Sequence, residues 1–140
     1  MYVRMAMAEC YVSPVEHSMI KWSRFGAWAG FLAVVLGAFG AHGLATMLKA
    51  SGRVETWETA VLYHLVHAPM ILVAARFAPS RARGVALGGF ASGMIVFSGT
   101  LYLLCVTGKT WLGAVTPIGG VLLLVGWAAT AFAVGAPRGE

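Results

Sequence analysis

Residues 25–44 read FGAWAGFLAVVLGAFGAHGL, a run of 20 residues that contains no Asp, Glu, Lys or Arg. Lys21 and Arg24 stand directly before it. An α-helix rises 1.5 Å per residue, so a run of this length spans about 30 Å, the thickness of the hydrocarbon core of a bilayer. The run therefore predicts a transmembrane helix with basic residues at its entry.

Three further apolar runs of similar length follow, at residues 57–77, 85–106 and 111–134. They do not alternate apolar and polar residues, as the strands of a membrane β-barrel do. The connections, 45–56, 78–84 and 107–110, are short, and short connections place consecutive helices antiparallel. We predict an all-α membrane protein, a compact antiparallel bundle of four transmembrane helices in one domain, residues 19–136.

The composition agrees with the lipid bilayer as the main partner. Hydrophobic residues make up 59% and charged residues 11% of the 140 residues, and the mean hydropathy is +0.80. Soluble domains carry about 25% charged residues. The net charge of +5 does not indicate nucleic-acid binding, because the basic residues stand at the ends of the apolar runs and form no stripe.

The distribution of basic residues predicts the orientation. Three lie on one side of the predicted bundle, namely Lys49, Arg53 and Lys109, and seven lie on the other, namely Arg4, Lys21, Arg24, Arg76, Arg81, Arg83 and Arg138. The positive-inside rule then places both termini, including the tail 137–140, in the cytoplasm of a bacterium, with the spans in its cytoplasmic (inner) membrane. Cys10 and Cys105 fall on opposite sides and cannot pair within one chain.

Two features near the ends of the runs leave alternatives open. Residues 1–18 contain no long apolar run, and we predict a disordered extension or a misassigned start, because Met19 opens a normal beginning for such a protein. A cleaved signal peptide is disfavoured, since the first run exceeds the usual 7–15 apolar residues. In the last run, Thr116 and Pro117 indicate either an N-cap with proline at the first helical position or a helix from Trp111 that is kinked at Pro117.

Small residues recur about one turn apart in the first and third runs. The main positions for close packing are Gly30, Gly37, Gly40, Gly89 and Gly93. Lipid tails are as apolar as leucine, so helices associate in membranes where small residues let their backbones approach. We expect the first and third helices to make tight contacts, and the same faces allow a homo-oligomer or a partner in a membrane complex.

Polar side chains inside the runs form the candidate site. His42, near the end of the first run, and His64 and His67, in the second, are expected at similar depth in the outer half of the bundle. The other members of the predicted cluster are Tyr63, Ser98, Tyr102 and Thr116. The favoured interpretation is a polar knot that ties helices together. The alternatives are a metal site made by the three histidines with Cys105, or a haem or quinone pocket.

No motif indicates a reaction. The middle of each run lacks a carboxylate, and no nucleophile–base pair or phosphate-binding glycine loop is present. We therefore predict no enzyme activity and no required cofactor. The leading hypothesis is a structural or accessory membrane protein, and the alternative is ligand binding, metal binding or transport at the histidines.

The same residues carry a family resemblance. It runs from about Phe25 to Trp127 and rests on ordered motifs, namely GAFGAH at 37–42, WETA at 57–60, FSGTLY at 97–102, TPIGG at 116–120 and GW at 126–127. These resemble the domain-of-unknown-function 423 family, which includes YgdD-like bacterial inner-membrane proteins and the eukaryotic transmembrane protein 256. The resemblance implies a small four-span protein without an established activity, and it supplies no catalytic residues.

Overall fold

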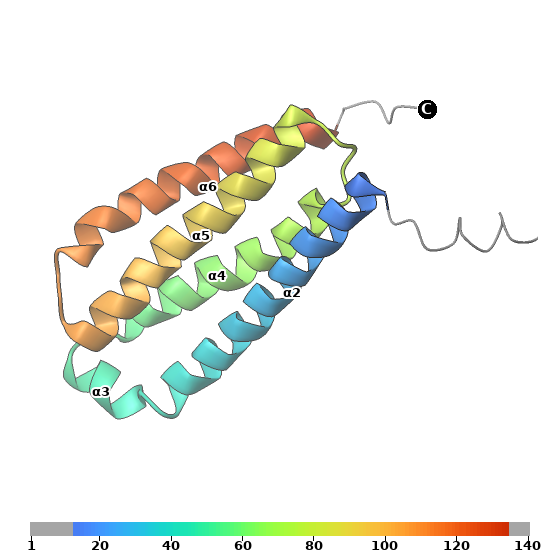
Figure 1. Cartoon of the computed structure of the whole chain (residues 1–140). Coiled ribbons are helices and arrows are strands. Elements are labelled where there is room, and N and C mark those ends of the chain that lie inside the picture. Colours follow the sequence, from blue (N-terminus) through green and yellow to red (C-terminus); the bar gives the residue numbers. More distant parts are fainter. Residues whose placement is uncertain (1–12, 135–140) are drawn as a thin grey trace, which may run out of the picture.

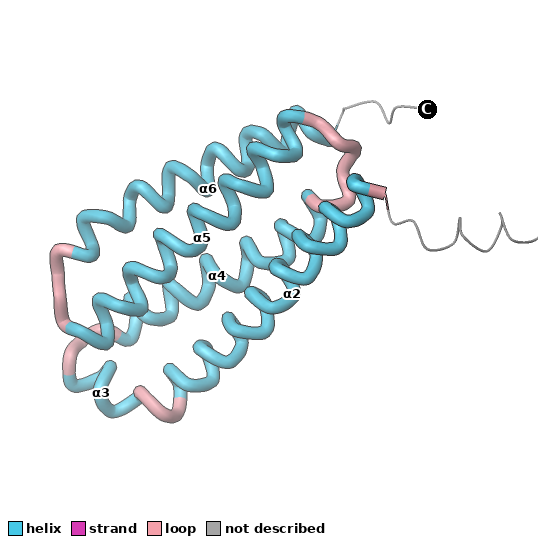
Figure 2. Tube along the Cα trace, viewed as in Figure 1, coloured by secondary structure: helices cyan, strands magenta, loops and turns pink. Residues whose placement is uncertain are grey.

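The computed structural model describes residues 13–134, which contain five helices and no strand. These are α2 (Pro14–Ala41), α3 (Ala45–Ala50), α4 (Val54–Ala74), α5 (Arg81–Thr107) and α6 (Leu112–Val134). The prediction of an all-helical protein is therefore confirmed. Short loops join the helices at both ends of the molecule (Figures 1 and 2).

The four long helices lie side by side in chain order. α2 packs on α4, α4 on α5, and α5 on α6, with the most extensive contact between α5 and α6. Figure 1 shows α5 and α6 as one neighbouring pair and α2 and α4 as the other. Because the helices alternate in direction, α2 and α5 begin at the same end of the molecule. α4 thus has long helices on both sides.

The first helix begins earlier than the apolar run. Ser13 is the N-cap, its Oγ accepts a hydrogen bond from the Glu16 amide at 3.2 Å, and Pro14 occupies the first turn. This Ser-Pro start is a standard helix signal. Residues 14–18 are therefore helical, so the predicted disorder is wrong for these residues. Residues 1–12 and the tail 137–140 lie outside the described residues.

The start of α6 decides between the two alternatives for the last run. The helix is continuous from Leu112 through Pro117, so the interpretation of Thr116 as an N-cap is wrong. The Thr116 hydroxyl instead bonds the Leu112 carbonyl at 3.2 Å, four residues back within the helix. Pro117 is the sixth residue of α6 and lacks the N–H that would donate to the Gly113 carbonyl, so the helix continues through it with that one bond missing.

The other helix ends follow local capping chemistry. Ser80 caps α5 by accepting a bond from the Arg83 amide at 3.1 Å, so that α5 begins at Arg81 and not at Val85. Gly108 ends the same helix in the left-handed conformation, with φ of 74°, where a side chain would be strained. The short helix α3 lies within the segment that we had expected to be a loop.

Glycines allow close approach between neighbouring helices. A Cβ atom added to Gly89 would lie 2.8 Å from the Cα of Gly126, and one on Gly93 would lie 2.8 Å from the Leu123 amide nitrogen. On α2, Gly40 faces the Trp57 indole, Gly37 faces Val61 and Gly30 lies more loosely against Ala68. Both predicted helices thus make close contacts, but with different partners: α2 with α4, and α5 with α6.

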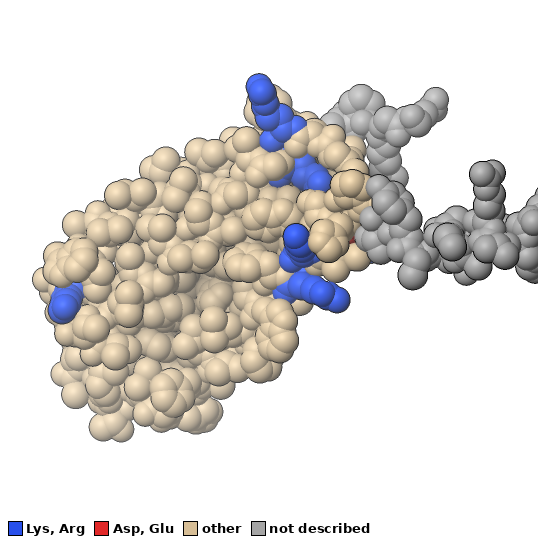
Figure 3. All heavy atoms as spheres, in the orientation of Figure 1, with Lys and Arg blue, Asp and Glu red and all other residues tan. Residues whose placement is uncertain are grey.

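Three helices, α2, α5 and α6, are long and apolar enough to cross a membrane. The fourth long helix, α4, carries Glu55, Glu58, His64 and His67, which interrupt its apolar stretch. Large apolar side chains are exposed along the bundle, among them Trp28, Phe31, Leu62, Ile95, Leu124 and Phe132. On the face shown in Figure 3, the basic side chains lie towards the two ends and leave the middle uncharged.

Candidate functional site

The structure does not bring the three histidines together. His42 is the exposed C-cap residue of α2, at the end of the bundle. His64 and His67 are buried in α4, with exposed fractions of 7% and 5%. The predicted cluster of three is therefore wrong for His42, because the first helix ends before His42 and turns into the loop towards α3.

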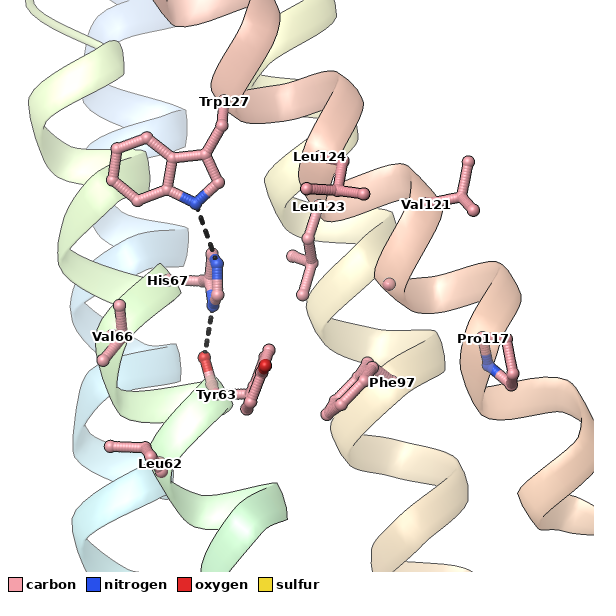
Figure 4. A pocket seen from close by; sticks show the side chains of 11 residues that line it. Leu62, Tyr63, Val66, His67, Phe97, Pro117, Val121, Leu123, Leu124 and Trp127 are labelled. Atoms are coloured by element: carbon pink, nitrogen blue, oxygen red, sulfur yellow. Dashed lines mark hydrogen bonds between the residues drawn. The ribbon is translucent and has the colours of Figure 1, made fainter.

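His67 links α4 to α6 through a chain of hydrogen bonds (Figure 4). The Trp127 indole nitrogen donates to Nε2 of His67 at 3.2 Å, and Nδ1 of His67 lies 2.6 Å from the Tyr63 carbonyl oxygen. Indole N–H can only donate, so Nε2 must accept. Neutral imidazole then carries its proton on Nδ1 and donates it to the carbonyl. Both ring nitrogens of His67 are thus used.

A groove opens beside this link. It has a volume of about 650 Å³, and its walls come from α4 and α6 with Phe97 of α5 between them. The Tyr63 ring stacks on Phe97 with centroids 4.2 Å apart and also on His67 at 5.8 Å. Figure 4 shows Leu62, Val66, Leu124 and Val121 around the same space. The groove is apolar, and its histidine is already satisfied.

His64 faces a different neighbour. Its Nδ1 lies 3.4 Å from the hydroxyl of Tyr102 on α5. The Tyr102 ring packs on Trp57 with centroids 4.8 Å apart, and the Trp57 indole donates to the Leu36 carbonyl on α2 at 3.1 Å. Ser98, one turn before Tyr102, is 1% exposed, and its Oγ has no partner among the described residues. These three helices thus meet around His64.

The remaining predicted members lie elsewhere. The Thr116 hydroxyl pairs with that of Thr100 at 2.9 Å, which connects α5 and α6. Cys105 is 2% exposed, and its thiol lies 3.8 Å from the Arg53 carbonyl. Within residues 13–134 no group of three or more His, Cys, Asp or Glu is placed to hold a metal ion. The proposed ligand set of His42, His64, His67 and Cys105 is therefore not assembled.

Sequence reasoning missed two kinds of contact. Trp127 stands in the middle of an apolar run, away from the interfaces where tryptophan usually lies, and its N–H needs an acceptor there. The position of Trp127 within the apolar run was therefore the sequence signal that could have predicted a buried hydrogen-bond acceptor for it. The second kind is an arginine at a helix start that bonds the end of another helix: Arg53 donates to the carbonyls of Leu104 and Gly108, and buried Arg83 donates to that of Ala75. Cations are favourable at helix C-termini.

Comparison with known proteins gives a consistent result. A family model described as "Protein of unknown function (DUF423)" matches residues 36–120. The UPF0382 membrane protein YwdK of Bacillus subtilis is 42% identical over 106 residues, which cover 73% of this chain and 85% of that protein. A UPF0382 membrane protein of Schizosaccharomyces pombe is 36% identical over 118 residues, 79% of this chain and 97% of its own length.

A third relative, from Haemophilus influenzae, is also named a UPF0382 membrane protein. It is 34% identical over 115 residues, 80% of this chain and 91% of its own length. No solved structure is significantly similar to the chain. The matches confirm the family resemblance that the ordered motifs indicated, and the names of these relatives state a membrane location without an activity.

Proposed function

We propose, from the premise that this chain belongs to the DUF423 family of membrane proteins, that it is a four-span structural or accessory component of the bacterial cytoplasmic membrane rather than an enzyme. The membrane location follows from the named relatives and the apolar helices. The observation that supports a structural role is the engagement of both His67 nitrogens in the link between α4 and α6. A histidine so occupied is unavailable to a substrate or a metal.

The fourth span in this proposal is α4. Its 21 residues can reach across the hydrocarbon core, since they rise about 32 Å. Leu62, Val66 and Val73 are exposed on its outer surface, whereas His64 and His67 are buried against neighbouring helices. Burial inside the bundle is where polar side chains of membrane helices belong. With four spans both termini share one side, and the basic residues favour the cytoplasm.

A double-mutant cycle on the His67–Trp127 link tests the structural role. His67→Leu removes the acceptor and leaves the indole N–H unpaired, so it should destabilise the bundle by about 1–2 kcal/mol. Trp127→Phe removes the donor and part of the packing against Phe90, whose ring centroid lies 5.4 Å away. The double variant should lose less than the sum of the two, with a coupling energy of about 0.6–2 kcal/mol.

Thermal or denaturant unfolding of the purified protein in detergent gives the unfolding free energies of wild type, the two single variants and the double variant. Trp111→Phe combined with His67→Leu is the matched control, because Trp111 is 62% exposed just before α6, and its effect should add to that of His67→Leu. Zero coupling between His67 and Trp127, with His67→Leu as stable as wild type, would contradict a structural role for the histidine.

A further inference from the structure

A cleft with charges of both signs lies where the start of α2 meets the end of α4, at one end of the bundle (Figure 1). Its volume is about 500 Å³, which falls in the range of small-molecule sites. Its lining is polar at Glu16, Ser23, Arg24 and Arg76 and apolar at Met19, Ile20 and Leu72. We call it the α2–α4 cleft. Its three charged side chains are exposed, so a ligand can reach them.

The α2–α4 cleft lies at the depth of lipid headgroups. Arg24 directly precedes the first apolar run, and Arg76 follows the end of α4 at Ala74. Deeper in the membrane the two helices close on each other, because a Cβ atom added to Gly26 would lie 3.0 Å from the Ala68 carbonyl oxygen. A molecule in the cleft is therefore held at the membrane surface and does not pass between the helices.

The charges of the cleft follow an order along α2. Glu16 and Arg24 are separated by eight residue steps, about 12 Å along the axis, and Ile20 lies between them on the same face. Because α2 enters the membrane from its start, the carboxylate lies on the aqueous side. A long side chain leans towards the start of its helix, which brings the Arg24 guanidinium closer to the level of Glu16. The cleft thus has cations next to the membrane and an anion farther out.

The two guanidinium groups of the cleft are available to a ligand. Arg53 and Arg83 donate to carbonyls at helix ends, whereas within residues 13–134 the side chains of Arg24 and Arg76 form no hydrogen bond. A guanidinium matches a phosphate with two parallel N–H···O bonds, so two arginines around one cleft suit a phosphate diester. A head with negative charge alone would also face the Glu16 carboxylate, and like charges repel. The cleft therefore fits a phosphate with a cation on its aqueous side.

We propose that the α2–α4 cleft binds the headgroup of phosphatidylethanolamine, a phospholipid whose phosphate is followed by a primary ammonium. The phosphate accepts hydrogen bonds from Arg24, Arg76 and the Ser23 hydroxyl. The ammonium has three N–H donors and pairs with Glu16. The acyl chains leave the cleft past Leu72 and continue along the bundle in the bilayer. Binding is non-covalent, and it uses none of the residues of the His67–Trp127 link, so the two proposals fail independently.

Paired charge variants separate the cleft from general attraction to the basic end of the bundle. Arg24→Gln combined with Arg76→Gln removes both guanidinium groups from the cleft. Lys21→Gln combined with Arg81→Gln is the matched control, because it removes the same charge at the same end from residues that do not line the cleft. All four positions are exposed, so both double variants should keep the unfolding temperature of wild type in detergent.

Binding is measured by native mass spectrometry of the full chain in micelles with increasing amounts of phosphatidylethanolamine. We expect saturable binding of a first lipid, with equal affinity for wild type and the control variant. The variant that lacks Arg24 and Arg76 should bind at least about tenfold more weakly, because it loses charge-assisted hydrogen bonds to the phosphate. No saturable binding to wild type, no loss in the cleft variant, or a comparable loss in the control would overturn the proposal.

The ammonium is tested with related lipids. In phosphatidylcholine the nitrogen carries methyl groups and cannot donate, so wild type should bind this lipid about fivefold more weakly. Glu16→Gln should bind the two lipids with nearly equal affinity. Phosphatidylglycerol has no cation and should bind wild type more weakly than phosphatidylethanolamine does. Equal affinity of wild type for the ethanolamine and choline lipids, or tighter binding of phosphatidylglycerol, would overturn the assignment of the headgroup.

A chain-free competitor distinguishes a lipid from a soluble ligand. Glycerophosphoethanolamine has the same phosphate and ammonium but no acyl chains. We expect it to compete at least about tenfold more weakly than the lipid, because it buries no acyl chain against the bundle. Displacement of the lipid by an equal concentration of this competitor would overturn the assignment of a membrane lipid.

Discussion

Replacing Gly89 with alanine should drive α5 and α6 apart. The added Cβ atom would lie 2.8 Å from the Cα and amide nitrogen of Gly126 and 2.9 Å from the Leu122 carbonyl oxygen, whereas ordinary contact begins near 3.4 Å. All three atoms belong to the backbone of α6, so no side chain can rotate away. The helices must separate by about 0.6 Å, a gap that forfeits about a quarter of the dispersion energy of each neighbouring contact. Overpacking of this kind costs about 1–3 kcal/mol.

Alanine also favours the helix itself, by up to about 1 kcal/mol relative to glycine. Gly88→Ala separates the two effects, because Gly88 is the preceding residue of α5 and its added Cβ meets nothing within 4 Å. Both variants gain the same helix propensity from alanine. The difference between their unfolding free energies therefore isolates the cost of the close contact between the added Cβ atom and α6. We expect Gly89→Ala to be less stable than Gly88→Ala by about 1–3 kcal/mol in detergent. Equal stabilities would refute the close backbone contact between α5 and α6.

Two further predictions concern orientation and helix capping. In intact cells, a membrane-impermeant maleimide should not label the chain, and labelling of Cys10 should appear after permeabilisation; Cys105 is buried and gives little background. Labelling of Cys10 in intact cells would contradict cytoplasmic termini. Arg53→Met removes the donor to the Leu104 carbonyl at the end of α5 and should cost about 1–2 kcal/mol of unfolding free energy, whereas Lys49→Met, at an exposed position of α3, should cost less than about 0.5 kcal/mol.

The sequence predicted the four long helices well, because each of them contains a long apolar run, but it did not predict the short helix α3. The sequence also indicated where α5 ends, because the third apolar run stops at residue 106, one residue before the helix ends against the left-handed Gly108. It failed where two signals compete. Thr116 followed by Pro117 also matches an N-cap, but the helix starts at Leu112 and continues through Pro117 with only the bond that proline cannot donate missing. Pro14 was overlooked because the helix it starts extends beyond the apolar run.

The candidate site was harder to predict because depth along a helix does not fix direction around it. His64 and His67 are three residues apart, which separates them by about 60° around the axis of α4. On a helix with neighbours on both sides, that angle is enough to send one imidazole to Tyr102 of α5 and the other to Trp127 of α6. The sequence gives no crossing angle and no helix order in space, so it cannot assign those partners.

The polar content of α4 follows from its position between two neighbours. Mean hydropathy averages over every side of a helix, but lipid contacts only the outward side. On α4 the outward side carries Leu62, Val66 and Val73, and the histidines face the bundle, where hydrogen bonds compensate for their burial. A helix at the centre of a small bundle can therefore hold two imidazoles and still present an apolar surface to lipid. For this reason we count α4 among the proposed spans, although its most apolar stretch is less hydrophobic than those of α2, α5 and α6.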